Sequence, residues 1–335
     1  MLAAALTFLV GGLSGCASPS STSSASASDR PGKAGDDSTG DGTSAACPAT
    51  ADVAEVPKRV VTLDAGAAAF LIALGLGDRI VGTAGPEFKD DFSGAMRKEL
   101  DALPVLSGKV ANKESVIAAK PDLVTGISRY ELGSFDGTPT QKQLKENGIA
   151  AMVACDTAKG RSTNIDATYR YITHLAEVFH VQDKGKALIA DMKREVADLT
   201  ASAGKRADAV PVLSLSAAPA GGAGINTSGG SSHANGVITL AGGRNVAAST
   251  PGDFATLSAE EASRSNPKVI LAVTGFSRQS GRRLVDAIKA SPLLADTDAV
   301  KNDRVVAIPQ SILLSPSVLG ARAVRTVAEA VEDAS

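Results

Sequence analysis

The chain has few aromatic residues and almost no net charge. Of its 335 residues 3% are aromatic, with no tryptophan and three tyrosines, so the composition does not indicate a large pocket of stacked rings. The 34 Lys and Arg residues are balanced by 36 Asp and Glu, which leaves a net charge of -2. Proteins that bind nucleic acid through its phosphates carry an excess of basic residues. That class is therefore excluded.

Long apolar runs are also missing. No stretch reaches the roughly 18 to 20 consecutive apolar residues that a bilayer-spanning helix needs, so we do not expect the chain to cross a membrane. Hydrophobic residues still make up 44% of the sequence, enough for a sizeable core. The length fits two ordinary domains of about 100 to 150 residues each.

The longest apolar run lies at the N-terminus, in MLAAALTFLVGGLSGCAS. It has the length of the apolar part of an export signal, and its LSGC ending resembles a bacterial lipobox, in which Cys16 is lipidated (palmitate) and becomes the new N-terminus. An ordinary signal peptide with a chance cysteine is the alternative. The Ser/Gly/Asp-rich stretch that follows is typical of a flexible linker. We expect a lipoprotein signal peptide over 1–16, a disordered tether over 17–50, and a folded body anchored to the outer face of the cytoplasmic membrane.

The remaining cysteines form an even pair. Cys16 set aside, the chain contains Cys47 and Cys155. Exported proteins form disulfides more readily than cytosolic ones. A disulfide between these two residues is our hypothesis, and two free thiols are the alternative.

Strands and helices alternate on short connections from about Pro57 onward. Such alternation is typical of parallel sheets covered by helices. In the first half the pattern predicts strands over 59–63, 80–83, 123–126 and 150–154, with helices between them at 67–74, near 114–120 and at 140–147.

A long helical zone separates this half from a second α/β half. The zone covers about 165–203, with a break near 180–182, and apolar residues recur in it at helical spacing. The second half predicts strands over 210–215, 269–273 and 305–309, and helices over 232–241, 281–290 and 316–331. We therefore expect an α/β fold of two lobes, 51–165 and 206–335, each with a mostly parallel sheet flanked by helices. A helical zone at 166–205, which includes one long backbone helix, should join the lobes. The ligand cleft should lie between them.

One local construction occurs in both halves. Glu114 and Glu260 each occupy the second position of a predicted helix, behind a capping residue, and each lies seven residues before a proline, Pro121 or Pro267, that introduces an apolar strand. A carboxylate in a first turn also complements the helix dipole, for roughly 0.3 to 1 kcal/mol. The dipole alone does not explain the matching positions. Two such carboxylates would present a symmetric pair to a partner that is itself paired.

From about Pro57 to the C-terminus the sequence resembles the extracytoplasmic substrate-binding lipoproteins of ABC importers for iron siderophores, haem and cobalamin. The resemblance is carried by PKRVVTLDAGAAAFLIALGLGDRIVGTAG, LPVLSGKVANKESVIAAKPDLV, ENGIAAMVACD, VITLAGGRNV, LSAEEASRSNPKVILA and NDRVVAIP, in this order. It implies a monomeric receptor without enzymatic activity or cofactor, which delivers its ligand to a permease dimer with its ATPase. It also implies that Glu114 and Glu260 dock into arginine pockets of the two permease subunits.

The ligand is expected between the lobes, at the carboxyl ends of the strands. Ferric siderophores often carry negative charge and planar chelating groups, which suit Arg and aromatic side chains. The strongest candidates are Arg129, Tyr130, Phe276 and Arg278. Further candidates lie in neighbouring turns: Asp64, Phe88, Ser231, His233 and Gln310.

Several alternatives stay open. Haem would find possible axial ligands in Tyr130 and His233, and cobalamin fits the same transport role. Zinc or manganese is disfavoured because the three histidines, His174, His180 and His233, show no metal-ligand spacing. A secreted hydrolase lacks a GxSxG motif near Ser231, and a purely structural envelope lipoprotein would have the same anchor but no ligand. We favour a ferric siderophore.

Overall fold

The computed structural model describes residues 53, 55–154, 161–201, 208–220, 224–276 and 281–335. The predicted lipidation at Cys16, the tether over 17–50, the disulfide between Cys47 and Cys155, and the ligand candidate Arg278 lie outside the described residues.

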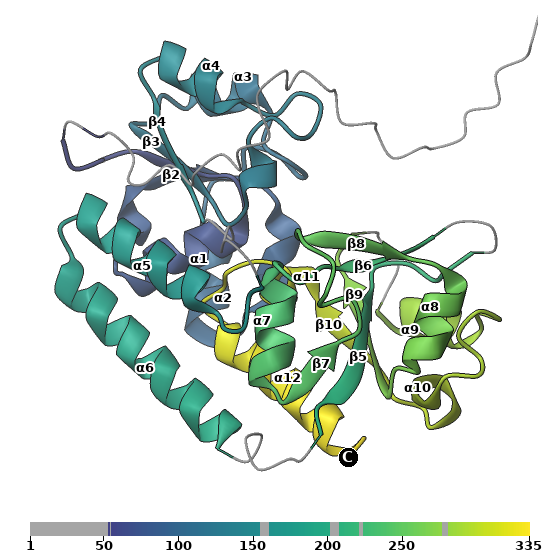
Figure 1. Ribbon diagram of the computed structural model, residues 1–335. Coiled ribbons are helices and arrows are strands. Elements are labelled where there is room, and N and C mark those ends of the chain that lie inside the picture. The colour runs from purple at the N-terminus through teal and green to yellow at the C-terminus, as the bar shows by residue number, and fades with distance from the viewer. Residues whose placement is uncertain (1–52, 54, 155–160, 202–207, 221–223, 277–280) are drawn as a thin grey trace, which may run out of the picture. The chain divides into compact units, whose positions relative to one another are not determined.

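The first half of the body forms a four-stranded parallel sheet in the order β2-β1-β3-β4 (Figure 1). Its strands coincide closely with the predicted ones and are listed with their bounds: β1 (Val60–Thr62), β2 (Ile80–Thr83), β3 (Leu123–Gly126) and β4 (Ala150–Val153). The strands are apolar because both faces of the sheet are covered. Val60 packs with α1 (Ala65–Ala73) on one face, whereas Val61 faces α3 (Lys113–Ala118) and α4 (Gln141–Glu146) on the other.

The second half forms another four-stranded parallel sheet, in the order β10-β9-β5-β7. Its strands are β5 (Val210–Leu215), β7 (Gly243–Asn245), β9 (Val269–Thr274) and β10 (Val305–Pro309). Successive residues of β5 again serve opposite faces. Val212 packs with α7 (His233–Leu240) and α12 (Gly320–Glu332), and Leu213 packs with α9 (Gly281–Lys289).

A two-stranded antiparallel ribbon in the second half was not predicted. It consists of β6 (Ile225–Ser228) and β8 (Phe254–Leu257), paired from Ile225 opposite Leu257 to Ser228 opposite Phe254. The sequence analysis assigned no strand to the segment that forms β6. The segment has few apolar residues and glycines on both sides, so it lacks the pattern of a strand. Its partner strand comes about thirty residues later, so no local pattern predicts the pairing.

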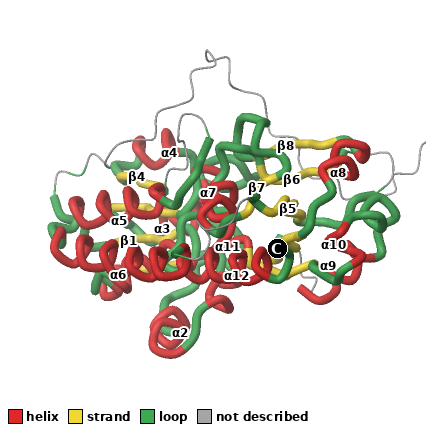
Figure 2. Tube along the Cα trace, turned by 60° about the horizontal axis from the view of Figure 1, so that its bottom comes forward, coloured by secondary structure: helices red, strands yellow, loops and turns green. Residues whose placement is uncertain are grey.

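Two helices fill the zone between the sheets. They are α5 (Asp166–Val178) and α6 (Gln182–Thr200), and the predicted break between them falls at His180, whose φ of 55° ends the helical path. The helix α6 contacts α5 and, from the second half, α12, and Figure 2 shows these helices side by side. The terminal helix α12 begins later than predicted because Pro316 and the short α11 (Gln310–Leu313) precede it.

Short elements complete the body. They are the 3-10 turns η1 (Gly77–Arg79), η2 (Pro86–Asp91) and η3 (Arg129–Glu131), and the helices α2 (Gly94–Asp101), α8 (Ala259–Ser265) and α10 (Asp298–Lys301). Among the described residues, none of the helices combines the length and the apolar character that a membrane span requires.

Candidate functional site

The strongest polar cluster at the strand ends involves two predicted ligand residues. Arg129 and Tyr130 form the turn η3 directly after β3. The Arg129 Nη2 atom lies 2.8 Å from Asp253 Oδ2, and the Tyr130 hydroxyl donates to the same oxygen at 2.9 Å. Asp253 belongs to the loop before β8, so these contacts join the two lobes. Two donors from one lobe therefore converge on a single carboxylate oxygen of the other.

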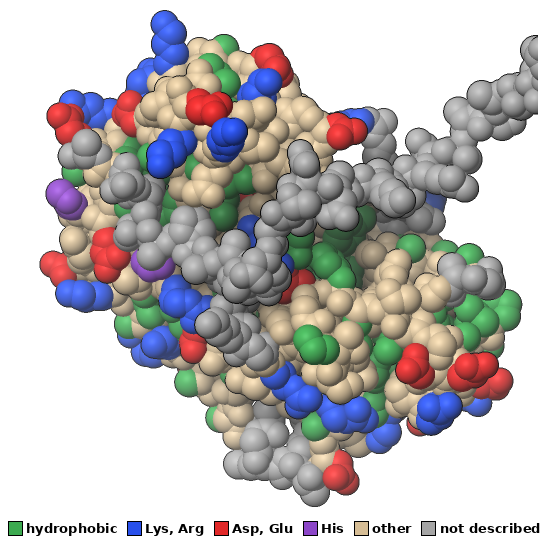
Figure 3. Space-filling view, turned by 45° about the horizontal axis from the view of Figure 1, so that its top comes forward, with side chains coloured by type: hydrophobic (Ala, Val, Ile, Leu, Met, Phe, Trp, Pro, Cys, Tyr) green, Lys and Arg blue, Asp and Glu red, His purple; other side chains and the backbone are tan. Residues whose placement is uncertain are grey.

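Aromatic and cationic contacts extend this cluster. The Arg129 guanidinium lies 5.0 Å from the centroid of the Tyr130 ring, and that ring lies 5.7 Å from the ring of Phe254. Phe254 is 62% exposed. In the space-filling view hydrophobic side chains are visible in a recess of the molecular surface (Figure 3). A guanidinium beside a phenol and an exposed ring is suited to an anionic group attached to a flat apolar body.

Behind η3 lies a pair of carboxyl groups that the sequence analysis did not assign as a pair. Asp64 is 1% exposed and caps α1, accepting from the Ala67 N–H at 2.8 Å and from the Ile127 N–H at 3.1 Å. Glu131 accepts from the Ser128 N–H at 3.0 Å and hydrogen-bonds to Asp64. Burial raises the pKa of both groups, and that of Glu131 is raised further by the neighbouring Asp64 charge. Asp64 thus supports η3 from the interior, and its contact with a ligand stays a prediction.

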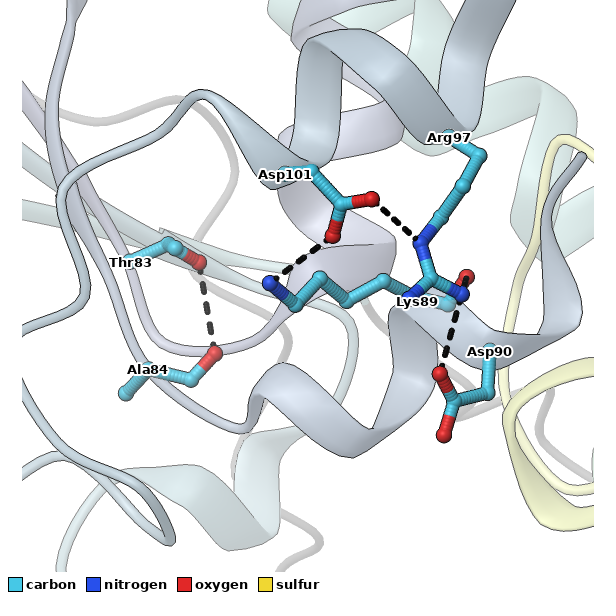
Figure 4. Close-up of polar contacts among 6 residues, drawn as sticks. All are labelled: Thr83, Ala84, Lys89, Asp90, Arg97 and Asp101. Carbon is cyan, nitrogen blue, oxygen red and sulfur yellow. Dashed lines mark hydrogen bonds and ion pairs between the residues drawn. The ribbon is translucent and has the colours of Figure 1, made fainter. Parts of the chain in front are cut away.

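The turn η2 carries Phe88, another predicted ligand residue. Phe88 is partly buried there against the core of the first lobe. Figure 4 shows how η2 is braced against α2: Lys89 lies 3.1 Å from Asp101, while Arg97 lies 2.8 Å from Asp101 and 2.9 Å from Asp90. The hydrogen bond from Arg97 lowers the pKa of Asp101. These ion pairs fix the path of η2.

At the end of η2, Asp91 forms a second contact between the lobes. Its carboxylate accepts a hydrogen bond from the Ser311 hydroxyl, and its carbonyl accepts from Arg322 at 2.5 Å. Burial raises the pKa of Asp91. Beside this contact lies a hollow of about 550 Å³ that includes Phe92 and Met96.

The predicted residues of the second lobe are dispersed. The Ser231 hydroxyl accepts from the Gly252 N–H at 3.2 Å, one residue from Asp253. Phe276 is 55% exposed at the end of β9. The Gln310 side chain lies against Gly275: a Cβ added at Gly275 would lie 3.0 Å from side-chain atoms of Gln310. The φ of 104° at Gly275 also favours glycine.

His233 occupies a different place. It is the first residue of α7 and is 3% exposed, and burial lowers its pKa to about 4. It borders a hollow of about 150 Å³ together with Arg161, Asp166 and Arg170. Tyr130, the other proposed haem ligand, contacts Asp253 and Phe254. Within the described residues, no group of three or more His, Cys, Asp and Glu side chains is placed to hold a metal ion.

The two repeated glutamates lie as the local pattern predicted. Glu114 is the second residue of α3, after the cap Asn112, and its side chain is 75% exposed. Glu260 is the second residue of α8, after Ser258, and is also exposed. Ser258 forms a capping box with the neighbouring Glu261. Both carboxylates are accessible to a partner, and their docking to a permease stays a prediction.

Three residues of these contacts were missed from the sequence. Asp253 lies in a loop and Asp91 is the last residue of η2, and neither has a local signature. Glu131 had one: Ser128 and Glu131 have the spacing of a capping box, and both hydrogen bonds of the box are present. That motif alone would have indicated that Glu131 points back toward the end of β3.

Comparison with known proteins identifies the fold and the family. The sequence matches the family described as Periplasmic binding protein over residues 60–312. It is 29% identical over 254 residues to the Fe(3+)-citrate-binding protein YfmC of Bacillus subtilis (strain 168), covering 76% of this chain and 73% of that protein.

Solved structures resemble the body closely. A periplasmic binding protein from Veillonella parvula superposes with a TM-score of 0.68 at 22% identity, covering 84% of this chain and 93% of the other. The structure of an ABC-type Fe3+-hydroxamate transport system from Saccharomonospora viridis gives a TM-score of 0.68 at 24% identity, covering 82% and 93%. Both therefore share the fold of this chain. The chain belongs to the periplasmic binding protein family and is a substrate-binding protein, not an enzyme.

Proposed function

We propose that this protein is the extracytoplasmic receptor of an ABC importer and that it binds an anionic ferric siderophore. The observation that carries the proposal is the convergence of the Arg129 guanidinium and the Tyr130 hydroxyl on one carboxylate oxygen, at 2.8 and 2.9 Å. Carboxylates and catecholates of ferric chelates offer the same kind of oxygen. The similarity to a curated Fe(3+)-citrate-binding protein supports iron chelates as the ligand class.

Delivery requires an anchor and a docking surface. We propose that Cys16 carries the lipid anchor and that Glu114 and Glu260 dock one permease subunit each. Both glutamates are exposed at equivalent positions of α3 and α8. Each is displayed by a helix that precedes a strand of its own sheet, so the two lobes would share the contact with a paired permease.

Haem and cobalamin are the competing ligands in the same transport role. A haem iron needs an accessible axial ligand, and His233 is 3% exposed. This burial disfavours His233 as an axial ligand and leaves Tyr130 as the accessible one. We rank a siderophore first because of the Arg129 and Tyr130 contacts with a carboxylate oxygen described above.

Calorimetric titration of the purified protein tests the ligand class. We expect submicromolar binding of a ferric carboxylate or catecholate chelate and no comparable binding of haem or cobalamin. The Arg129→Gln variant should weaken binding about 10-fold to 100-fold, because a charged hydrogen bond contributes roughly 1.5 to 3 kcal/mol.

A matched control is Arg194→Gln, which removes an exposed guanidinium on α6 that forms an ion pair with Asp191 of the same helix. It should bind as tightly as the wild type. Tight binding of haem or cobalamin in place of every ferric chelate would contradict the proposal.

A further inference from the structure

Asp253 occupies a defined position on the second lobe. Its carbonyl accepts a hydrogen bond from the Gly229 N–H at 2.9 Å, and its side chain is only 14% exposed. The preceding Gly252 has a φ of 95°, which favours glycine, and a Cβ at Gly229 would lie 2.4 Å from the Gly252 carbonyl oxygen. Two glycines thus allow the close backbone packing that places this carboxylate.

The partner groups on the first lobe are placed just as firmly. The Ser128–Glu131 capping box closes the turn that carries Arg129 and Tyr130. Glu131 is hydrogen-bonded to Asp64 in the interior, and Asp64 in turn caps α1. Neither side of the contact depends on a long loop that would have to become ordered for the contact to form.

The charges of this contact cancel. The Arg129 guanidinium and the Asp253 carboxylate form an ion pair at 2.8 Å, with the arginine side chain 46% exposed and the aspartate 14% exposed. The Tyr130 hydroxyl donates to the same Asp253 oxygen, which raises the number of donors on that oxygen to two. The Tyr130 hydroxyl has a single hydrogen, so a ligand oxygen that accepts it must displace the Asp253 carboxylate, and an anionic group beside the Arg129 guanidinium competes with Asp253 for its charge.

We propose that Asp253 is a specificity-determining residue whose carboxylate competes with the anionic groups of the chelate for Arg129 and Tyr130. The inference rests on the proposed function and deepens it. The free energy that an anionic chelate gains at this site is only the difference between its own contact with Arg129 and Tyr130 and the contact that Asp253 already makes. Weakly charged competitors are therefore rejected. Binding is also coupled to breaking a contact between the lobes.

Titration of the full-length protein and its Asp253→Asn variant with two probes tests this inference. Ferric citrate is the anionic probe, and ferrichrome, an uncharged ferric hydroxamate, is the neutral one. The variant keeps an oxygen acceptor for Tyr130 but removes the competing charge. Its affinity for ferric citrate should rise about tenfold, while its affinity for ferrichrome should stay within about twofold of wild type.

Two further variants make the test specific. Asp286→Asn removes one negative charge from the exposed side of α9 and should not change either affinity. Arg129→Gln combined with Asp253→Asn should remove most of the gain for ferric citrate, because the cation for which ligand and Asp253 compete is gone and only the Tyr130 hydroxyl remains. Thermal unfolding of each variant checks that the fold is retained.

Unchanged or weaker ferric citrate binding by a folded Asp253→Asn variant, with wild-type binding present, would overturn the inference. Equal gains for both probes would overturn it as well, since competition by charge predicts a difference. Absence of binding of every chelate to the wild-type protein would instead remove the proposed function, and the inference with it.

Discussion

At the residue scale, the hydrogen-bonded pair of Asp64 and Glu131 controls the turn that carries the proposed ligand contacts. A Cβ at Gly126 would lie 2.3 Å from Glu131 Oε2, so only glycine leaves room for this carboxyl group. The Tyr171 hydroxyl and Thr125 Oγ1, 2.7 Å apart, complete the polar interior beneath the sheet. Two carboxyl groups in contact away from water share a proton more readily than they carry two charges.

This pair predicts a pH dependence of stability. The pKa values of both groups are raised on folding, so the folded state holds protons that the unfolded chain releases. The free energy of unfolding should therefore be greatest below the unfolded pKa values, near pH 4, and should fall as the pH rises through the raised folded values. Glu131→Gln, whose amide can donate to Asp64 and accept from Ser128, should remove the part of this loss that Glu131 causes.

Chemical denaturation at about pH 5 and about pH 8 measures this effect. The variant should gain roughly 1 kcal/mol over wild type at the higher pH relative to the lower one. Glu146→Gln, at an exposed position of α4, is the control and should follow the wild-type profile. Parallel profiles for wild type and Glu131→Gln would contradict the shared proton.

The predicted ligand residues differ in burial, and the sequence does not show which of their side chains are exposed. Arg129 and Tyr130 were predicted from their place after an apolar strand, and the structure puts them at an inter-lobe contact. Asp64 and His233 were chosen by the same argument but are buried. A turn after a strand locates the neighbourhood of a site, whereas the direction of each side chain depends on what packs beside it.

At the element scale, the close packing of the segment before α5 on the helix α7 depends on one glycine within α7. A Cβ at Gly236 would lie 2.0 Å from the carbonyl oxygen of Asn164, and Asn235 Nδ2 donates to the Ser162 carbonyl at 2.5 Å. The stretch before α5 therefore lies directly on α7. No local pattern distinguishes this glycine from those that only weaken a helix.

We predict that Gly236→Ala destabilises the protein. In a free helix the substitution would stabilise by about 1 kcal/mol, but here the backbone oxygen cannot move aside without displacing the segment, so a loss of about 1 to 3 kcal/mol is expected. Urea denaturation measures it. Gly108→Ala, where a Cβ would meet nothing within 4 Å, is the matched control. Equal stability of Gly236→Ala and wild type would show that the two segments do not pack this closely.

At the scale of the whole molecule, α6 limits how far the lobes can move. It is a continuous helix of 19 residues that contacts both α5 and α12. A packed helix does not absorb the large dihedral changes that hinge strands or loops absorb. The two lobes are therefore expected to close only slightly.

Small-angle scattering with and without the ligand tests this expectation. The radius of gyration should fall by no more than about 1 Å, a small part of the value expected for a chain of this size. The ligand-free Asp253→Asn variant, which lacks the ion pair with Arg129, is a useful companion sample. A compaction of several ångströms in wild type would mean that the lobes move about a flexible hinge.

Docking to the permease is also a property of the whole molecule. Replacing both Glu114 and Glu260 by alanine should abolish import of the chelate and leave its affinity unchanged, because both side chains are exposed and project from helix starts. Each change should cost less than about 1 kcal/mol of stability. Uptake of labelled iron in cells and titration of the purified protein measure the two properties separately.

Glu177→Ala with Glu329→Ala removes two exposed carboxylates from α5 and α12 and should import normally. If the Glu114 and Glu260 double variant imported at the wild-type rate, these residues would not be the docking contacts.

The sequence by itself determined the alternation of strands and helices, the break before α6 and the capped positions of Glu114 and Glu260. These features follow from periodicity, caps and prolines, which act within a few residues. Only the tertiary structure decided that Asp253 meets Arg129 across 124 residues of sequence, that β6 pairs with β8, and that His233 is buried. Contacts of this kind depend on how elements that are distant in sequence pack together. The pattern of neighbouring residues does not predict that packing.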